Sequence, residues 1–198
     1  MPEKRTRAGR RPGGQSSRAE ILRAAKALFS ECGYEATTLR AIAAEARVDS
    51  AMIVHFYRTK EGVFAAILDQ LSEALPAMSP GSRFGEGGLD ATKLARSYLT
   101  FWESPETGPA VRALARGALG SPNATAVMRE FLRSRVFTTS ATPGTELASA
   151  TLLGVAVTRH LVRVGPLADM PLEALIEHVT PVLRRELDKA TRAPERTA

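Results

Sequence analysis

The chain of 198 residues holds a single cysteine, Cys32, and only 6% aromatic residues. One cysteine excludes an intramolecular disulfide framework, so the sequence favours a reducing compartment. Short runs of β-branched residues with alternating polarity, which are typical of strands, are nearly absent, whereas alanine and leucine are plentiful. With 44% hydrophobic residues to fill a core, the composition predicts a globular, all-α protein.

Long uninterrupted apolar runs are also missing. The longest apolar segment, LASATLLGVAVTRHLVRV, contains Arg159, His160 and Arg163, so it is a poor membrane span. The basic N-terminus has no apolar run behind it of the length that a signal peptide needs. We therefore expect a soluble, cytoplasmic protein with no membrane partner.

Residues for catalysis or metal binding are scarce. The chain has three histidines, His55, His160 and His178, and no glycine-rich phosphate loop. These residues and the lone Cys32 do not form a catalytic or metal-ligating pattern. The sequence therefore predicts no enzyme activity, no metal and no cofactor.

Positive charge is concentrated in the first third of the chain. Residues 1–60 hold 12 Lys or Arg against 6 Asp or Glu, and residues 61–198 hold 15 of each. This excess predicts a head that binds a polyanion, on an electrically balanced body. A basic tail that only aids solubility is the alternative on charge alone.

The first predicted helix follows an arm of residues 1–15, whose composition indicates a flexible segment. We expect the helix to open with a capping box at Ser17 and Glu20. Gly33 would end it, because glycine readily takes the left-handed conformation that follows many helices.

Two short helices are predicted next. The first takes Thr37 or Thr38 as its N-cap, and the second takes Asp49, after a turn at Arg47-Val48. The second has an apolar face of Met52, Ile53, Phe56 and Tyr57, which leaves positions 50, 51, 54, 55 and 58 on the other side. Small side chains at the start of a short helix suit the major groove of B-DNA, so residues 16–60 predict a helix-turn-helix DNA-binding domain.

The stretch ALFSECGYEATTLRAIAAEARVDSAMIVHFYRTKEGVFAAIL resembles the DNA-binding region of the tetracycline-repressor (TetR) family of transcriptional regulators. The features shared with that family are a helix that ends in Gly-Tyr, a Thr-Thr start, and an aromatic pair followed by a lysine. Arg47 stands where the family usually has glycine, and Val54 where many members have a tyrosine. The later stretch FWESPETGPAVRALARGALGSP resembles an actinobacterial subgroup of these regulators.

The resemblance implies contacts to DNA. Thr38 would bind a phosphate at a helix N-terminus, Ser50 and Ala51 would lie nearest the bases, and Lys60 would contact a phosphate. The positions that we expect to contact DNA are Thr38, Arg40, Arg47, Ser50, Ala51, Met52, His55 and Lys60. In the arm, Arg10 and Arg11 would probe the minor groove, or they belong to a tail with no fixed contacts.

The body, residues 61–188, is expected to bind a ligand and to dimerise, and residues 189–198 to form a disordered tail. A helix from about residue 60 to Leu75 would connect it to the head, and five amphipathic helices are predicted near 89–103, 107–119, 122–138, 145–164 and 171–188. Pro181 should kink or break the last of them.

Two sets of body residues are candidate sites. Side chains on apolar helix faces, with two arginines one turn apart, would line a ligand cavity: Tyr98, Phe101, Trp102, Arg112, Arg116, Met128 and Phe131. In the family, the last two long helices form a four-helix dimer interface, which implies contacts by Gly154, Thr158, Leu161, Leu175, Val179 and Leu183. Core packing and a solvated face are the alternatives for the first set, and a monomer for the second.

These features predict a dimeric DNA-binding transcriptional regulator, a repressor that a small-molecule effector releases from a palindromic operator. A nonspecific basic DNA-packaging protein is the main alternative, but it leaves a large apolar body unexplained. An all-α enzyme is the other.

Overall fold

The structure is a computed structural model that describes residues 15–73, 90–136 and 142–192. Within these ranges every regular element is a helix, as the composition predicts. None of the described helices is long and apolar enough to span a membrane. The arm with Arg10 and Arg11, and residues 74–89 between the connecting helix and the next one, lie outside the described residues.

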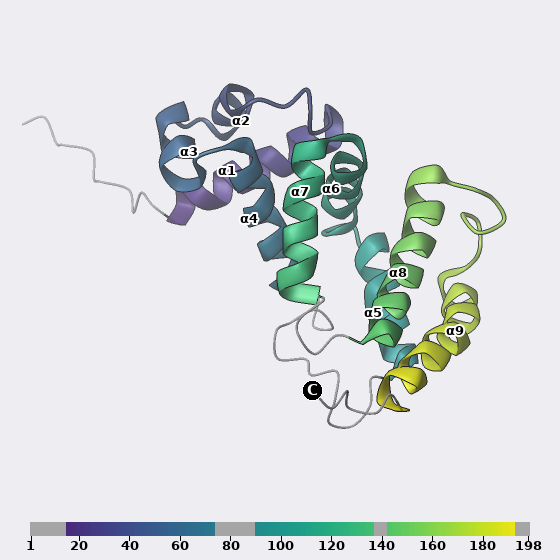
Figure 1. Cartoon of the computed structure of the whole chain (residues 1–198). Helices are drawn as coiled ribbons and strands as arrows, with labels where there is room; N and C mark the ends of the chain where they lie inside the picture. Colours follow the sequence, from purple (N-terminus) through teal and green to yellow (C-terminus); the bar gives the residue numbers. More distant parts are fainter. Residues whose placement is uncertain (1–14, 74–89, 137–141, 193–198) are drawn as a thin grey trace, which may run out of the picture.

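Four helices form the first half of the chain: α1 (Gln15–Glu31), α2 (Leu39–Ala46), α3 (Ser50–Tyr57) and α4 (Lys60–Glu73). Figure 1 places α1–α3 at one end of an elongated molecule and α8 and α9 at the other. The capping box predicted at Ser17 is wrong, because α1 already begins at Gln15 and Ser17 lies inside the helix. The Ser16 hydroxyl, one residue earlier, donates to Glu20 at 3.3 Å.

The helix starts that frame the turn are those predicted. Thr38 is the N-cap of α2, and its hydroxyl oxygen accepts the Ala41 N–H at 3.1 Å. Asp49 is the N-cap of α3, and its carboxylate accepts the Ala51 N–H at 2.7 Å. Gly33 has a φ of +81°, the left-handed conformation expected after α1.

A first hydrophobic core holds the head together and extends beyond it. It joins α1–α4 to α6 and α7, so the predicted domain boundary at residue 60 does not divide the packing. Phe29, Tyr34 and Phe64 form its aromatic centre, with ring centroids 5.2 to 6.0 Å apart. Gly117 lets α6 come close, because a Cβ at this position would lie 3.0 Å from the Tyr34 Cβ.

The described part of the body contains five further α-helices. Their bounds are α5 (Ala91–Glu103), α6 (Gly108–Gly120), α7 (Pro122–Phe131), α8 (Pro143–Val157) and α9 (Leu172–Arg192). A π turn extends α7 as η2 (Leu132–Val136), and another extends α8 as η3 (Thr158–Val162). A second hydrophobic core is built from α5, α8 and α9 alone.

The last helix is longer than predicted and is not broken at Pro181. α9 continues through Pro181 and ends at Arg192, so no break occurs and the predicted tail from residue 189 is helical at its start. Proline removes the hydrogen bond to the carbonyl four residues earlier, which here belongs to Glu177. Both residues are exposed, so water can satisfy that carbonyl.

Arg159 binds the segment between α8 and α9 to the end of α5. Its side chain is 9% exposed, and its guanidinium forms an ion pair with Glu103 at 2.8 Å. The same group donates to the carbonyls of Leu167 and Met170, each at 2.7 Å. A buried charge inside an apolar run needs such partners.

We predict that Arg159→Ala lowers the free energy of unfolding by about 3–5 kcal/mol, because it leaves Glu103 and the carbonyls of Leu167, Ala168 and Met170 without their donor. Arg159→Lys should recover little of this, since one ammonium cannot reach acceptors arranged around a planar fork. Urea unfolding measures both values. A loss below about 1 kcal/mol for the alanine variant would show that the cluster does not stabilise the fold.

Candidate nucleic-acid interface and ligand cavity

The outward face of α3 is formed by Ser50, Ala51, Val54 and His55, all of which are exposed. The opposite side of the helix carries Ile53, which is fully buried in the first core. The helix therefore presents two small side chains in its first turn, followed by Val54 and His55 one turn later. This is the arrangement expected of a helix that enters a DNA groove.

Met52 does not belong to that face. Its side chain is half-buried and packs against the first core. A residue on this side of α3 holds the helix against the domain, and the base contact expected of Met52 stays a prediction.

The start of α2 adds polar groups on the surface of the head. Thr38 and Arg40 are both exposed. The Thr38 oxygen accepts the Ala41 N–H, so the hydroxyl proton stays available for an external acceptor. A helix N-terminus with a free donor is a natural place for a phosphate.

Arg47 adopts a backbone conformation that usually belongs to glycine. It ends α2 with a φ of 55° and a ψ of 42°, and its side chain is exposed. Left-handed backbone costs an ordinary residue about 1–2 kcal/mol. The turn thus keeps the geometry that glycine would give it, and gains a positive charge beside α3.

Lys60 has an internal role that the sequence did not reveal. Its ammonium donates to the carbonyls of Tyr34 at 2.9 Å and Glu35 at 3.3 Å, and lies 4.3 Å from the centroid of the Tyr34 ring. Lys60 therefore ties the start of α4 to the segment that leads into α2. The phosphate contact stays a prediction, for which one N–H of the ammonium remains.

A tight turn joins α3 to α4. Arg58 has a φ of 64° and a ψ of −51°, and the Thr59 N–H donates to the Tyr57 carbonyl at 2.8 Å, which is a classic γ-turn. Gly62 makes room for it, because a Cβ there would lie 2.0 Å from the Tyr57 carbonyl oxygen. The orientation of α3 relative to α4 therefore depends on Gly62.

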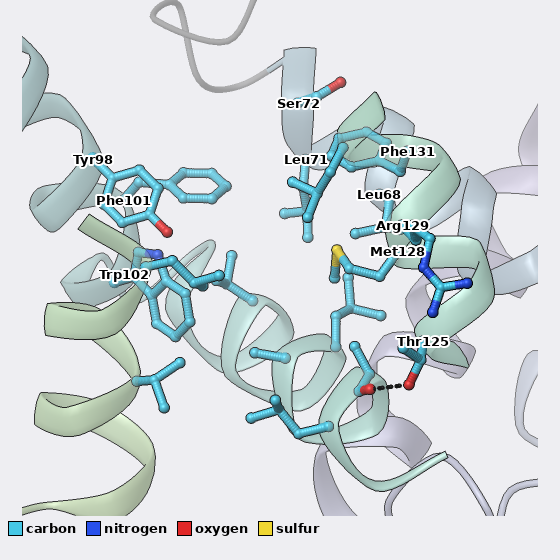
Figure 2. A pocket seen from close by; sticks show the side chains of 18 of the residues that line it. Leu68, Leu71, Ser72, Tyr98, Phe101, Trp102, Thr125, Met128, Arg129 and Phe131 are labelled. Carbon is cyan, nitrogen blue, oxygen red and sulfur yellow. Dashed lines mark hydrogen bonds between the residues drawn. The ribbon is translucent and has the colours of Figure 1, made fainter. Parts of the chain in front are cut away.

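A cavity of about 500 Å³ lies between the two cores. On one side it is lined by Leu68, Leu71, Met128 and Phe131 from α4 and α7, and on the other by residues of α5 and α8. Figure 2 shows Tyr98, Phe101 and Trp102 of α5 facing the first group across the open space. Of the predicted pocket residues, Tyr98, Phe101, Trp102, Met128 and Phe131 line this cavity.

The two predicted arginines of the pocket do not line it. Arg112 turns toward α5 and donates to the Trp102 carbonyl at 2.7 Å, and Arg116 is exposed on α6. That expectation is wrong, because the helix face that carries both residues is turned away from the cavity. Leu114 of α6 and two residues of α8, Leu153 and Val157, line the cavity but were not predicted from the sequence.

Polar groups of the cavity wall have partners inside the protein. Ser72 donates to the Asp69 carbonyl at 2.7 Å, and Thr125 donates to the Ser121 carbonyl at 2.7 Å. Burial raises the pKa of Tyr98 to about 12, and the neighbouring Trp102 indole acts in the opposite direction. The wall is therefore mostly apolar, and the hydroxyls of Ser72 and Thr125 have no proton left to donate to a ligand.

Behind this wall, His160 stacks on Trp102, with ring centroids 5.8 Å apart and an interplanar angle of 13°. Its Nε2 is buried without a hydrogen-bond partner among the described residues. Burial lowers the pKa of His160, the charges of Arg159 and Arg112 lower it further, and Glu103 opposes them. The folded protein thus favours the neutral imidazole.

The predicted dimer residues fall into two groups. Leu175, Val179 and Leu183 are at most 6% exposed and pack against α5 and α8 of the same chain, so their expected contact with a partner is wrong. Gly154 is exposed, with open space where a Cβ would be, and Thr158 and Leu161 are half-buried. The exposed apolar side chains on α8 and α9 are instead Leu147, Leu153 and Val182.

Arg47→Gly should raise the free energy of unfolding by about 0.5–1 kcal/mol, because relief of the left-handed strain exceeds the added entropy of the unfolded chain. DNA affinity should fall on all sequences alike, with a salt slope smaller by about one unit, if the side chain contacts a phosphate. Arg47→Ala is the matched control: it should weaken DNA binding similarly without stabilising the fold. Equal free energies of unfolding for Arg47→Gly and Arg47→Ala would show that the backbone at this position is not strained.

The buried His160 predicts a dependence of stability on pH. The pKa of an unfolded histidine is about 6.5, and that of His160 is lower in the fold, so the unfolded chain takes up the proton first as the pH falls. Stability should therefore decrease below about pH 6.5 and level off below the folded pKa. His160→Phe should flatten urea-unfolding midpoints between pH 7 and 5, and an unchanged pH dependence would contradict this assignment.

Comparisons with known proteins agree with this arrangement. Residues 21–67 match the family model described as bacterial regulatory proteins, tetR family, and residues 91–187 match that of the tetracyclin repressor-like C-terminal domain. A TetR-family regulator from Streptomyces coelicolor A3 has a similar structure, with 29% identity, a TM-score of 0.64, and coverage of 91% of this chain and 99% of that one. A multidrug binding protein, EbrR, crystallised with ethidium, shares the fold at 20% identity, with a TM-score of 0.59 and coverage of 86% and 98%.

Among curated relatives, the HTH-type transcriptional regulator BetI 2 of Chromohalobacter salexigens is 30% identical over 115 residues. The match covers 49% of this chain and spans little more than half, 56%, of that relative. The two family models together cover the head and the body, which are joined in one fold. The chain belongs to the TetR family of DNA-binding transcriptional regulators.

Proposed function

We propose that the protein is a dimeric repressor that binds a palindromic operator and is released from it by a small-molecule effector. The observation that carries this proposal is the position of the cavity between two separate cores. One core contains the DNA-binding helices with α4, α6 and α7, and the other contains α5, α8 and α9. A ligand between them contacts both units at once.

DNA recognition is assigned to α3. Ser50, Ala51 and His55 would reach base edges or the backbone in the major groove, while Thr38, Arg40 and Arg47 contact bases or phosphates beside it. Support comes from the exposure of all six side chains. Val54 adds an exposed apolar group of the kind that contacts a thymine methyl.

Dimerisation is assigned to the outer faces of α8 and α9. Leu147 is 55% exposed and Val182 is 41% exposed. Ala150 and Gly154 are exposed on the same face of α8 and would allow a partner helix to approach closely. A four-helix interface of two copies would cover this surface.

Release follows from geometry. In a symmetric dimer the two α3 helices must enter successive major grooves, about 34–36 Å apart. A ligand that shifts α4, α6 and α7 relative to α5 and α8 would move each head with its core and change that separation. A preference of about 2.7 kcal/mol for the shifted state lowers operator affinity about a hundredfold, and the operator must weaken ligand binding by the same factor.

The proposal is tested by selecting DNA bound by the full chain from a random pool. We expect an inverted repeat with half-sites about one helical turn, or a multiple of it, apart. Recovery of unrelated sequences would instead support a nonspecific packaging protein and contradict the proposal. The proposed repressor would act in the cytoplasm, the reducing compartment that the single cysteine favours.

On the selected site, Arg40→Ala and Ser50→Ala should each change the preferred base at one position, at a cost of roughly 1–3 kcal/mol per lost direct contact. Arg116→Ala serves as control, since this exposed arginine lies on α6 in the body. Binding titrations against the selected site and its single-base variants measure the change. Equal losses on selected and random DNA would show that the two residues carry no sequence information.

A further inference from the structure

The cavity between the cores offers a ligand apolar surface and few hydrogen bonds. Its deep wall is built from leucines of α4 and α6 and from Phe101, Met128 and Phe131. The hydroxyls of Ser72 and Thr125 already donate to carbonyls of the protein. A ligand body that needs hydrogen bonds would lose those it makes to water and regain few.

Charge at the cavity has one sign. None of the described residues that line it is acidic, and the two charged ones are Arg129 and Arg133, on α7 and its extension. The Arg133 guanidinium is paired with Glu130 at 3.1 Å, whereas that of Arg129 has no partner among the described residues. Figure 2 shows Arg129 beside Thr125 at the edge of the cavity.

We infer that this cavity takes a single-chain amphiphile with an anionic head group. The apolar chain lies against the wall between α4 and α5, and the head stays near the rim, where Arg129 supplies the unpaired positive charge. An organic cation in the same position would meet two guanidinium groups and no carboxylate of the described wall. The inference rests on ligand binding at the cavity in the proposed function, and adds the chemical class of the ligand.

Three probes of equal chain length separate the alternatives: decanoate, decanol and decylammonium. The chain has one tryptophan, and Trp102 lines the cavity, so its fluorescence reports binding directly. We expect decanoate to bind best and decylammonium to bind about tenfold more weakly. From octanoate to dodecanoate, affinity should rise about fourfold per added methylene, because each one is buried against the wall.

Matched variants locate the head and the chain. Arg129→Ala should weaken decanoate about fivefold and leave decanol unchanged, whereas Arg116→Ala should change neither. Ala118→Phe places a ring in the cavity wall and should weaken all three probes. Thermal unfolding checks that each variant folds. If Ala118→Phe does not fold, the variants of the exposed Arg129 and Arg116 still test where the head group binds.

Tighter binding of decylammonium, affinity independent of chain length, no binding of any probe, or equal effects of the two arginine variants would each overturn the inference. These titrations are made without DNA, so they are separate from the release of the operator. If decanoate binds as expected but leaves operator affinity unchanged, the effector role in the proposed function fails and the ligand class stands.

Discussion

The burial of Tyr34 is the interaction on which the rest of the structure depends. Its ring packs against Phe29 of α1 and Phe64 of α4, its hydroxyl donates to Glu61 at 2.9 Å, and its carbonyl accepts Lys60. Burial, with this hydrogen bond to Glu61, raises the pKa of the Tyr34 hydroxyl well above its usual range. One residue between the first two helices thus fixes the head to α4, and Gly117 brings α6 against the same ring.

In the proposed function, that attachment would let a ligand in the body act on a distant DNA-binding surface. The head shares one core with α4, α6 and α7, while α5, α8 and α9 form another. A small third cluster, centred on Trp102, Ala115 and Ala156, joins α5, α6 and α8. The cavity lies beside this joint, and under the proposed function a ligand there would change the packing of both units together.

Local features of the fold were predictable from the sequence, because they depend on neighbours a few residues apart. Thr38 and Asp49 cap their helices as expected, and the faces of α3 follow from a period of 3.6 residues. The start of α1 was misplaced, since both Ser16 and Ser17 stand three or four residues before Glu20 and only the backbone decides between them. Arg159 gave a readable signal, a charge within an apolar run, but its partners come from α5 and from the segment before α9.

The sites were predictable only in part, because a stripe of apolar residues shows that a helix face is buried but not what covers it. Leu175, Val179 and Leu183 are covered by the same chain, and Arg112 reaches a carbonyl of α5 instead of the cavity.

The central claim, that a ligand between the cores changes the separation of the two heads, is tested most directly by a distance. With Cys32 replaced by serine and a spin label at Glu45→Cys, on the exposed side of α2, pulsed electron paramagnetic resonance measures the label-to-label distance in the dimer. The account predicts a distance in the operator complex that shifts by several ångströms when Trp102 fluorescence reports a bound ligand, and the same distance with the ligand bound would contradict it.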